Sequence, residues 1–411
     1  MVVQGEFMVA FIRYLAKRIV RIISFLLFGF LPIKRNRVLL LNNLSHNYSC
    51  NLKAIAEYLL SNFSVNEFQI IYSVKDLSKE IYLKDKGIIL VKFNSLKYFY
   101  YLMTSKIVVS NSGGYSYIHK RSNQVIINTH HGGGAYKYAG ADMFGHSFFF
   151  VKDLQLTKRN TDIFLSTNKK FTEVISRASY LPKHIFWEIG MPRNDKLLKP
   201  NNAEINKIRE KIGLSKNEKL VLYAPTYRKE NDNYFKKSIS LDYGIDSNRV
   251  CNALAKRFGG EWKFALRLHP CITDKSAYLI DNVIDLSDYE DMQDLLLVAD
   301  VLINDFSSSF WDFMLTGKPC FMYAIDLQKY IETTKVYTPV EEWPFPKSTN
   351  NNELEKNILE FDESKYQEDC KNHYNKLGGC ESGRATELVC ELIDSIVNNK
   401  KYSLNNLPQF D

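Results

Sequence analysis

The sequence has few cysteines, and their pattern excludes two classes of small stabilised domain. Seven cysteines are scattered over 411 residues at irregular spacing, and no Cys-x-x-Cys pair occurs. An odd number without such pairs argues against a disulfide framework and against a zinc ribbon. We therefore expect reduced thiols and a cytosolic location.

Other signatures are also missing. The chain has no internal repeat, no low-complexity tract, no phosphate loop ending in Gly-Lys-Ser or Gly-Lys-Thr, and no Asp-x-Asp to hold a metal between nucleotide phosphates. Hydrophobic residues make up 45% and charged residues 24%, close to the average of soluble globular proteins. These values exclude a disordered chain, a collagen and a polytopic membrane protein.

Basic residues are in modest excess and give a formal net charge of +8. Such an excess fits nucleic acid, anionic lipid or a phosphate-rich substrate. Dense Lys/Arg runs with interleaved aromatic residues, which mark nucleic-acid-binding surfaces, do not occur in the sequence. Nucleic acid is therefore the least expected of the three partners.

The N-terminal region has the pattern of a helix on a membrane surface. Apolar residues recur at helical spacing over Phe7–Phe30, while Arg13, Lys17 and Arg21 are four residues apart and share one face. A basic face beside an apolar face fits an interfacial helix on anionic lipid, and we expect one over residues 1–33. The alternatives are an ordinary core-packing helix and a signal or anchor segment, although no small-x-small cleavage site follows.

After this region, short Val/Ile/Leu runs alternate with helical stretches. Runs without polar alternation are typical of strands buried on both faces of a parallel sheet, so we expect an α/β, doubly wound fold. The expected strands are Val38–Leu41, Gln69–Ser73, Ile88–Val91, Ile107–Ser110, Val125–Asn128, Ile163–Ser166, Ile185–Ile189, Lys219–Tyr223, Lys263–Leu268, Val283–Asp285, Val301–Asn304 and Cys320–Tyr323.

The strand–helix pattern occurs twice, with a polar seam near Lys196–Ile205. We expect one Rossmann-like domain over residues 34–198 and a second, with C-terminal helices, over 199–411. Two such domains facing a cleft form the GT-B arrangement of glycosyltransferases. Ligands in sheets of this type bind beyond the carboxyl ends of the strands.

The first polar cluster at a strand end combines histidine with glycine. His130 and His131 follow the strand Val125–Asn128 and precede three glycines. Glycines let backbone N–H groups approach an anion closely, and a histidine beside such a loop suits proton transfer at neutral pH. The alternative is a flexible loop with two surface histidines.

Four further clusters place cations or hydroxyls at strand ends. They are Gly190–Asp195, Tyr223–Arg228, Arg267–Pro270 and Asn304–Phe313. Arg193 suits a bidentate contact with phosphate, and Arg267 with His269 suits a pyrophosphate. Serine hydroxyls at the start of a helix form an anion site. Taken singly, each cluster also fits a turn, a solvated side chain or a helix cap.

Taken together, the five clusters resemble the CDP-glycerol:poly(glycerophosphate) glycerophosphotransferase family of teichoic acid and capsule synthesis. The resemblance covers about Val125–Tyr330 and rests on Pro-Arg-Asn-Asp, Ala-Pro-Thr-aromatic-Arg, Arg-x-His and Asp-aromatic-Ser-Ser motifs at Pro192–Asp195, Ala224–Arg228, Arg267–His269 and Asp305–Ser308. The family's His-Gly-Thr-Pro loop corresponds to His131–Gly134, with Gly133 and Gly134 in place of Thr-Pro. His130 stands where the family usually has an aromatic residue.

The resemblance implies transfer of a polyol phosphate from a CDP-linked donor to a hydroxyl of a lipid-linked or polymer acceptor, with release of CMP. It implies His131, as general base, and His269 as catalytic residues. The residues implied in binding the donor and its phosphates are Gly132, Gly133, Gly134, Arg193, Pro225, Thr226, Arg267, Ser307, Ser308 and Asp312.

The expected N-terminal interfacial helix and the reduced thiols together place the protein peripherally at the cytoplasmic face of the cell membrane. Cationic side chains would neutralise the pyrophosphate, so we expect no metal site and no cofactor, with at most weak assistance from Mg²⁺. The alternative is a GT-B glycosyltransferase that uses a nucleotide sugar for capsule or lipopolysaccharide synthesis.

Overall fold

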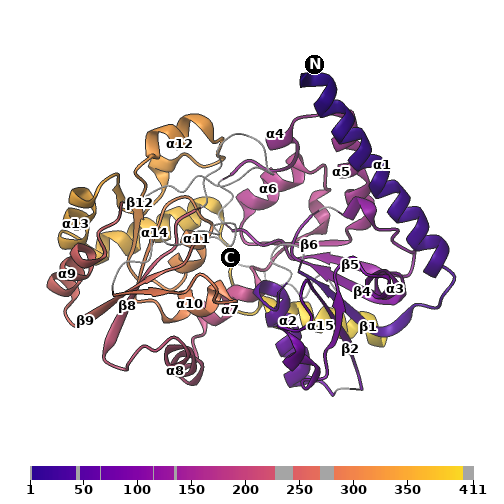
Figure 1. The fold of residues 1–411 in the computed structure, drawn as a ribbon, viewed down its shortest axis with the longest axis horizontal. Helices are drawn as coiled ribbons and strands as arrows, with labels where there is room; N and C mark the ends of the chain where they lie inside the picture. Colours follow the sequence, from indigo (N-terminus) through magenta and orange to yellow (C-terminus); the bar gives the residue numbers. More distant parts are fainter. Residues whose placement is uncertain are drawn as a thin grey trace. The chain divides into compact units, whose positions relative to one another are not determined.

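The chain forms two compact units in a computed structural model that describes residues 2–42, 47–64, 66–113, 115–133, 137–226, 244–268 and 282–400. Unit 1 comprises Met1–Asp195 together with Gly378–Asp411, and unit 2 comprises Lys196–Leu377. Each unit contains one parallel sheet with helices packed against it (Figure 1). The α/β class expected from the sequence is therefore confirmed.

The sheet of unit 1 has seven parallel strands in the order β3-β2-β1-β4-β5-β6-β7. The strands are β1 (Lys34–Leu41), β2 (Gln69–Val74), β3 (Ile89–Lys92), β4 (Ser105–Ser110), β5 (Val125–Asn128), β6 (Ile163–Ser166) and β7 (Phe186–Glu188). The helices are α1 (Val2–Phe28), α2 (Cys50–Asn62), α3 (Leu96–Thr104), α4 (Gly140–Phe144), α5 (Phe148–Asn160), α6 (Lys169–Ala178) and α15 (Ala385–Asn398), and α7 (Asp195–Leu198) leads into unit 2.

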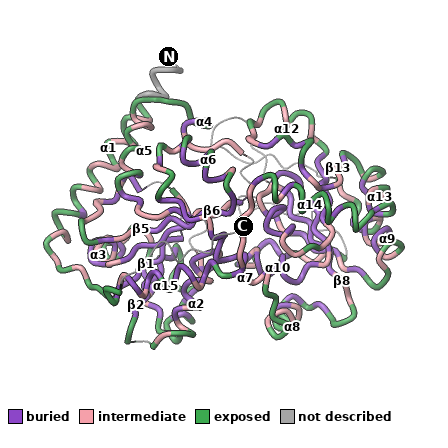
Figure 2. The backbone as a smooth tube through the Cα atoms, turned by 180° about the vertical axis from the view of Figure 1, so that it is seen from behind, coloured by how far each residue is buried: buried purple, intermediate pink, exposed green. Residues whose placement is uncertain are grey.

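Strand β1 explains why the strands of this sheet have continuous apolar sequences. Successive side chains of a strand point to opposite faces, and helices cover both faces of this sheet. Val38 and Leu40 therefore lie in one core layer, while Leu39 and Leu41 lie in the other. All four side chains are fully buried, and the tube at the β1 label has the colour of buried residues in Figure 2.

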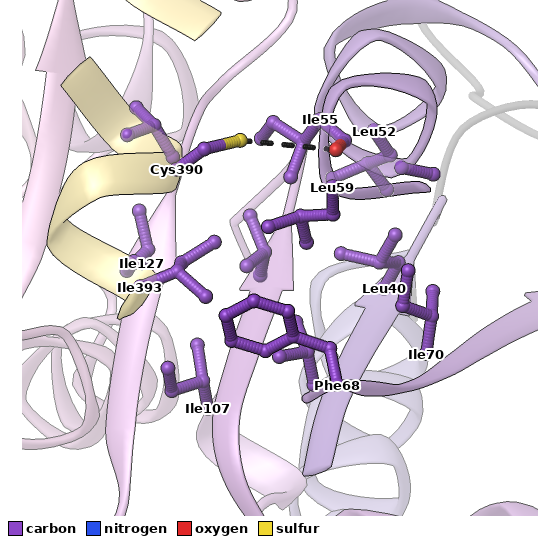
Figure 3. Packing of buried hydrophobic residues seen from close by; sticks show 14 of the residues in the cluster. Leu40, Leu52, Ile55, Leu59, Phe68, Ile70, Ile107, Ile127, Cys390 and Ile393 are labelled. Atoms are coloured by element: carbon purple, nitrogen blue, oxygen red, sulfur yellow. Dashed lines mark hydrogen bonds between the residues drawn. The ribbon is translucent and has the colours of Figure 1, made fainter. Parts of the chain in front are cut away.

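The C-terminal helix α15 completes the core of unit 1. Ile393 of α15 and Leu52 of α2 belong to the same buried cluster as Leu40 of β1 (Figure 3). The Cys390 thiol lies 3.8 Å from the Ile55 carbonyl oxygen, which α2 contributes. The sequence-based division assigned all of residues 199–411 to the second domain, whereas the structure groups the chain from Gly378 onward with unit 1.

The sheet of unit 2 has six parallel strands in the order β10-β9-β8-β11-β12-β13. The strands are β8 (Glu218–Tyr223), β9 (Glu261–Leu266), β10 (Val283–Asp285), β11 (Val301–Asn304), β12 (Cys320–Tyr323) and β13 (Lys347–Ser348). The helices are α8 (Asn202–Lys211), α9 (Ser247–Phe258), α10 (Met292–Val298), α11 (Ser309–Met314), α12 (Leu327–Thr333), α13 (Asn351–Leu359) and α14 (Glu363–Leu377). All strands expected from the sequence form, and β13 is additional.

Helix α1 packs on unit 1 through its basic face. Lys17 and Arg18 form ion pairs with Asp153 of α5, and Arg21 donates a hydrogen bond of 2.5 Å to the Ile118 carbonyl oxygen. Acceptors of the protein thus engage both Lys17 and Arg21, which the sequence pattern placed on a basic face toward lipid, although 41% of the Lys17 side chain stays exposed.

The opposite face of α1 is apolar, and Figure 2 shows many residues along this helix in the colour of exposed residues. Its exposed residues are Met8, Val9, Phe11, Ile12, Leu15, Ile19, Ile22, Ile23, Phe25, Leu26 and Leu27. Over the described part of the chain, no helix has both the length and the apolar character required to cross a bilayer.

Candidate active site

The histidine loop of unit 1 begins where β5 ends. The Asn128 side chain accepts a hydrogen bond of 2.8 Å from the backbone N–H of His130. His130 has a φ of +52°, a left-handed conformation that few residues without a local hydrogen bond adopt. This turn directs the chain out of the sheet and sets His130 and His131 side by side, with ring centroids 4.6 Å apart and nearly parallel planes.

His131 is held in one tautomer. Its Nδ1 atom lies 2.9 Å from the Asn111 carbonyl oxygen, directly after β4. Because a carbonyl oxygen only accepts, Nδ1 carries the hydrogen and Nε2 keeps its lone pair. Burial lowers the pKa of His131 to about 4; the Asn111 carbonyl opposes this shift and the charge of Arg193 adds to it. The imidazole is therefore neutral near pH 7 and has a nitrogen able to accept a proton.

His130 supports the loop. Its ring contacts Phe171 edge to face, at 5.1 Å between centroids, and its Nδ1 accepts a hydrogen bond of 3.2 Å from the Gly132 N–H. Burial, together with the neighbouring His131, lowers the pKa of His130 well below its usual value. His130 thus occupies the position of the family's aromatic residue and packs as an aromatic ring does.

Arg193 is brought to this loop from the turn after β7. Its guanidinium donates a hydrogen bond to the His131 carbonyl oxygen, and its backbone N–H donates one of 3.0 Å to the Asn51 side chain. Asn51, at the start of α2 and fully buried, also donates a hydrogen bond of 2.9 Å to the His130 carbonyl oxygen. Asn51 therefore joins the two segments that the sequence patterns singled out separately.

The expected residues of unit 2 follow three adjacent strands, β9, β8 and β11. Pro225 and Thr226 follow β8, Arg267 follows β9, and Ser307 and Ser308 follow β11. Because these strands are parallel neighbours, their carboxyl ends lie along one edge of the sheet. The Thr226 N–H donates a hydrogen bond of 2.8 Å to the Asp305 carboxylate. This bond joins the segment after β8 to the segment after β11.

Arg267 is a largely buried cation in unit 2. One guanidinium nitrogen donates a hydrogen bond of 3.0 Å to the Tyr289 carbonyl oxygen, and Nη1 is buried without a hydrogen-bond partner among the described residues. Burial lowers the pKa of Arg267, and the nearby Asp291 and Asp294 oppose this shift. A buried guanidinium of this kind suits a dianionic phosphate.

Ser307, Ser308 and Asp312 differ in exposure. Both serines are partly exposed, and the Ser307 hydroxyl oxygen lies 3.0 Å from that of Ser309. Ser308 stands at the N-cap position of α11, but its side chain makes no capping hydrogen bond. Asp312 is buried, and its carboxylate accepts a hydrogen bond of 2.9 Å from the Gln293 side chain.

Two of the expected residues, Gly134 and His269, lie outside the described residues. Three contributing residues were not expected from the sequence: Asn51, Asn111 and Gln293. Asn111 stands in the polar stretch that follows β4, which is the kind of strand-end signal that identified the other clusters. Nothing in the local sequence distinguishes Asn51 or Gln293.

Comparison with known proteins agrees with these motifs. The model of the CDP-glycerol:poly(glycerophosphate) glycerophosphotransferase family matches residues 23–395. The chain belongs to this family. Membership extends beyond the Val125–Tyr330 region on which the sequence resemblance rests, and it confirms that resemblance and the assignment of the protein as a transferase.

Individual members of the glycerophosphotransferase family align over most of their length. The teichoic acid poly(glycerol phosphate) polymerase of Bacillus spizizenii is 32% identical over 76% of this chain and 80% of its own. The teichoic acid glycerol-phosphate transferase of Staphylococcus aureus is 29% identical over 84% and 90%. A structure of the wall teichoic acid polymerase TagF matches with a TM-score of 0.75 and 28% identity over 90% of each chain.

Proposed function

We propose that the protein transfers glycerol phosphate, or a similar polyol phosphate, from a CDP-activated donor to a hydroxyl of a teichoic acid or related acceptor. Family membership supports this reaction, and relatives named as glycerol-phosphate polymerase and transferase support the donor class. The observation that carries the proposal is the neutral His131, oriented by Asn111 with Nε2 as its proton-accepting atom.

In the proposed step, the acceptor hydroxyl oxygen attacks the β-phosphorus of the donor. A new P–O bond forms to the acceptor, and the bond from the β-phosphorus to the bridging oxygen breaks, so that CMP leaves. The hydroxyl proton passes to Nε2 of His131, which later releases it to water. The Asn111 carbonyl stabilises the resulting imidazolium through the Nδ1 hydrogen bond.

The remaining residues are proposed to bind the donor. Arg193, with the backbone N–H groups of Gly133 and Gly134, would hold phosphate next to His131, because a guanidinium and glycine amides suit anions. The Gly132 N–H instead donates to His130 Nδ1, so Gly132 would shape the loop. The residues of unit 2 proposed to hold the donor's phosphates and nucleotide are Pro225, Thr226, Arg267, His269, Ser307, Ser308 and Asp312. His269 is also proposed as the second catalytic histidine.

Donor choice tests the proposal directly. Purified protein is incubated with a glycerol-phosphate oligomer as acceptor and with CDP-glycerol, CDP-ribitol or a panel of nucleotide sugars, and released CMP, UDP and GDP are measured. We expect CMP from a CDP-polyol and no UDP or GDP. Release of UDP or GDP alone would instead support the glycosyltransferase alternative.

We further propose that the protein is peripheral at the cytoplasmic face of the membrane, with α1 lying in the interface. The exposed apolar face of α1 supports this, because an apolar surface of this extent is stabilised by contact with acyl chains. Lys34 and Arg35, the exposed first two residues of β1, follow α1 after five intervening residues and would add contacts with anionic headgroups.

A further inference from the structure

Residues 378–386 form a segment that packs across the carboxyl ends of β6 and β7. The Cys380 N–H donates to the Thr167 carbonyl oxygen, and the Lys169 N–H donates to the Gly378 carbonyl oxygen, each at 2.9 Å. The Ser382 hydroxyl donates a hydrogen bond of 3.1 Å to the Ile189 carbonyl oxygen. This return of the chain therefore lies against the turn that carries Arg193.

Glu381 is the centre of these contacts. One carboxylate oxygen accepts hydrogen bonds from the Thr167 hydroxyl at 2.6 Å and from the Asn194 side chain at 3.0 Å. The other oxygen accepts a hydrogen bond of 3.0 Å from the Met191 N–H. A single carboxylate thus holds the residues on both sides of Pro192-Arg193.

The turn and the carboxylate are in close contact. Gly190 has a φ of +88°, and a Cβ atom at this position would lie 2.4 Å from a Glu381 carboxylate oxygen. Only glycine allows the backbone to approach so closely. The other end of the turn is also bound, since the Asp195 carboxylate accepts hydrogen bonds from the N–H groups of Ala385 and Thr386 at 3.1 and 2.7 Å.

We propose that Glu381 is a positioning residue for the transfer reaction, acting through the turn that carries Arg193. Glu381 holds this turn from one side while Asn51 holds the Arg193 N–H from the other, and the guanidinium is then directed to the His131 carbonyl oxygen. The proposal rests on the proposed roles of Arg193 and His131. A displacement of about 1 Å in such a group lowers a rate about 100-fold.

Kinetics of Glu381→Ala and Glu381→Gln test this role. Glu381→Ala removes every acceptor, so we expect kcat/KM for CDP-glycerol to fall about 100-fold. Glu381→Gln keeps one acceptor for Met191, and the Thr167 hydroxyl and the Asn194 amide are able to reorient, so it should recover to within about tenfold of the wild type. Glu391→Ala, a change at an exposed residue of α15, is the matched control and should stay within about twofold.

A double-variant cycle separates positioning from general stability. We expect Glu381→Ala combined with Arg193→Gln to be no slower than Arg193→Gln alone, because the turn has then already lost its functional group. A multiplicative loss, an unchanged rate in Glu381→Ala, or a Glu381→Gln variant as slow as Glu381→Ala would overturn the proposal. If Glu381→Ala does not fold, Asn194→Ala removes one of the three hydrogen bonds and enters the same cycle.

Hydrogen exchange gives a readout that does not depend on the activity. In Glu381→Ala, amides of residues 186–195 should exchange faster while those of β1 are unchanged, because only the turn loses its acceptor. If the wild type releases no CMP, the proposed function fails and the exchange still decides whether Glu381 holds the turn. Unchanged exchange over residues 186–195 would refute that hold.

Discussion

The Asn111 carbonyl oxygen lies 2.9 Å from Nδ1 of His131. This contact fixes which imidazole nitrogen is able to accept a proton, in the way that an orienting partner fixes the tautomer of catalytic histidines in general. It also distinguishes the two adjacent histidines, since His130 uses its Nδ1 to accept the Gly132 N–H. Of the two adjacent histidines, His131 therefore has a proposed chemical role and His130 has a structural role.

Removing the His131 imidazole should abolish transfer without abolishing donor binding. We expect His131→Ala to lower kcat about 10²- to 10⁴-fold, the usual contribution of a general base. The Kd for CDP-glycerol, measured by calorimetry, should change less than about threefold, because the proton acceptor makes little contact with the donor in the ground state.

His184→Ala, a change at an exposed histidine of unit 1, is the control and should behave as the wild type. His130→Ala should weaken the loop and reduce activity partially. If His130→Ala is inactive while His131→Ala is active, the roles of the two histidines are reversed.

The pH dependence follows from the lowered pKa of His131, about 4 instead of the ordinary 6.5. The neutral imidazole is the base and exists above its pKa, so activity is lost as the pH falls through about 4. We expect kcat/KM to be level from about pH 5.5 to 8, where an unperturbed histidine would show an acid limb near pH 6.5. Initial rates from about pH 3 to 8, with folding checked by circular dichroism at each pH, measure this limb.

Arg193 provides an internal check on that limb, because its positive charge contributes to the lowered pKa of His131. In Arg193→Gln the acid limb should move to higher pH. A limb that stays at the same pH in this variant, or a wild-type limb near pH 6.5, would contradict the assignment of His131 as the base.

Arg267 should act in donor binding and not in proton transfer. A charge-assisted hydrogen bond contributes about 1.5–3 kcal/mol, so Arg267→Ala should raise the Kd for CDP-glycerol about 10- to 150-fold. Arg267→Lys should recover only part of this loss, since an ammonium group lacks the guanidinium's fork of donors. Lys211→Ala, which removes an exposed ion pair with Glu290 on the same unit, is the control. Unchanged donor affinity in Arg267→Ala would remove this residue from the phosphate site.

The strands of both sheets could be predicted from the sequence because they are buried on both faces. Runs such as Val38–Leu41 can be recognised as strands from their own residues alone, because burial on both faces of the sheet requires an apolar residue at every position. Strand β13 was missed because Lys347 and Ser348 are two residues of mixed character that read as a loop.

Contacts between distant segments were not predictable in the same way. Helix α15 has an ordinary helical pattern, and nothing in it indicates that Ile393 packs against a sheet that begins at Lys34. The same holds for Asn51 and Glu381, whose importance lies in partners more than 100 residues away in sequence. Strand-end motifs succeeded because the topology of a parallel sheet gathers strand ends without requiring knowledge of individual contacts.

The basic side chains of α1 contact the protein, so we expect membrane binding to depend on the apolar face of this helix. Because protein acceptors hold Lys17, Arg18 and Arg21, the helix offers lipid an apolar face, and binding through such a face is weakly screened by salt. We expect the protein to sediment with phosphatidylcholine vesicles as well as with phosphatidylglycerol vesicles, and to stay bound in 0.5 M NaCl (about a 4 Å screening length).

Aspartate in place of Ile22 and Leu26, which are 56% and 68% exposed, should release the protein from vesicles without unfolding the helix. Burying each side chain contributes about 1.5 kcal/mol or more, so the double change should lower vesicle affinity at least about 100-fold. Leu359→Asp, an exposed apolar position in α13, is the matched control and should leave binding unchanged. Binding confined to anionic vesicles and lost in high salt would assign the interaction to charge instead. A dimer in solution that the double variant dissociates would assign the apolar face of α1 to a second copy of the chain.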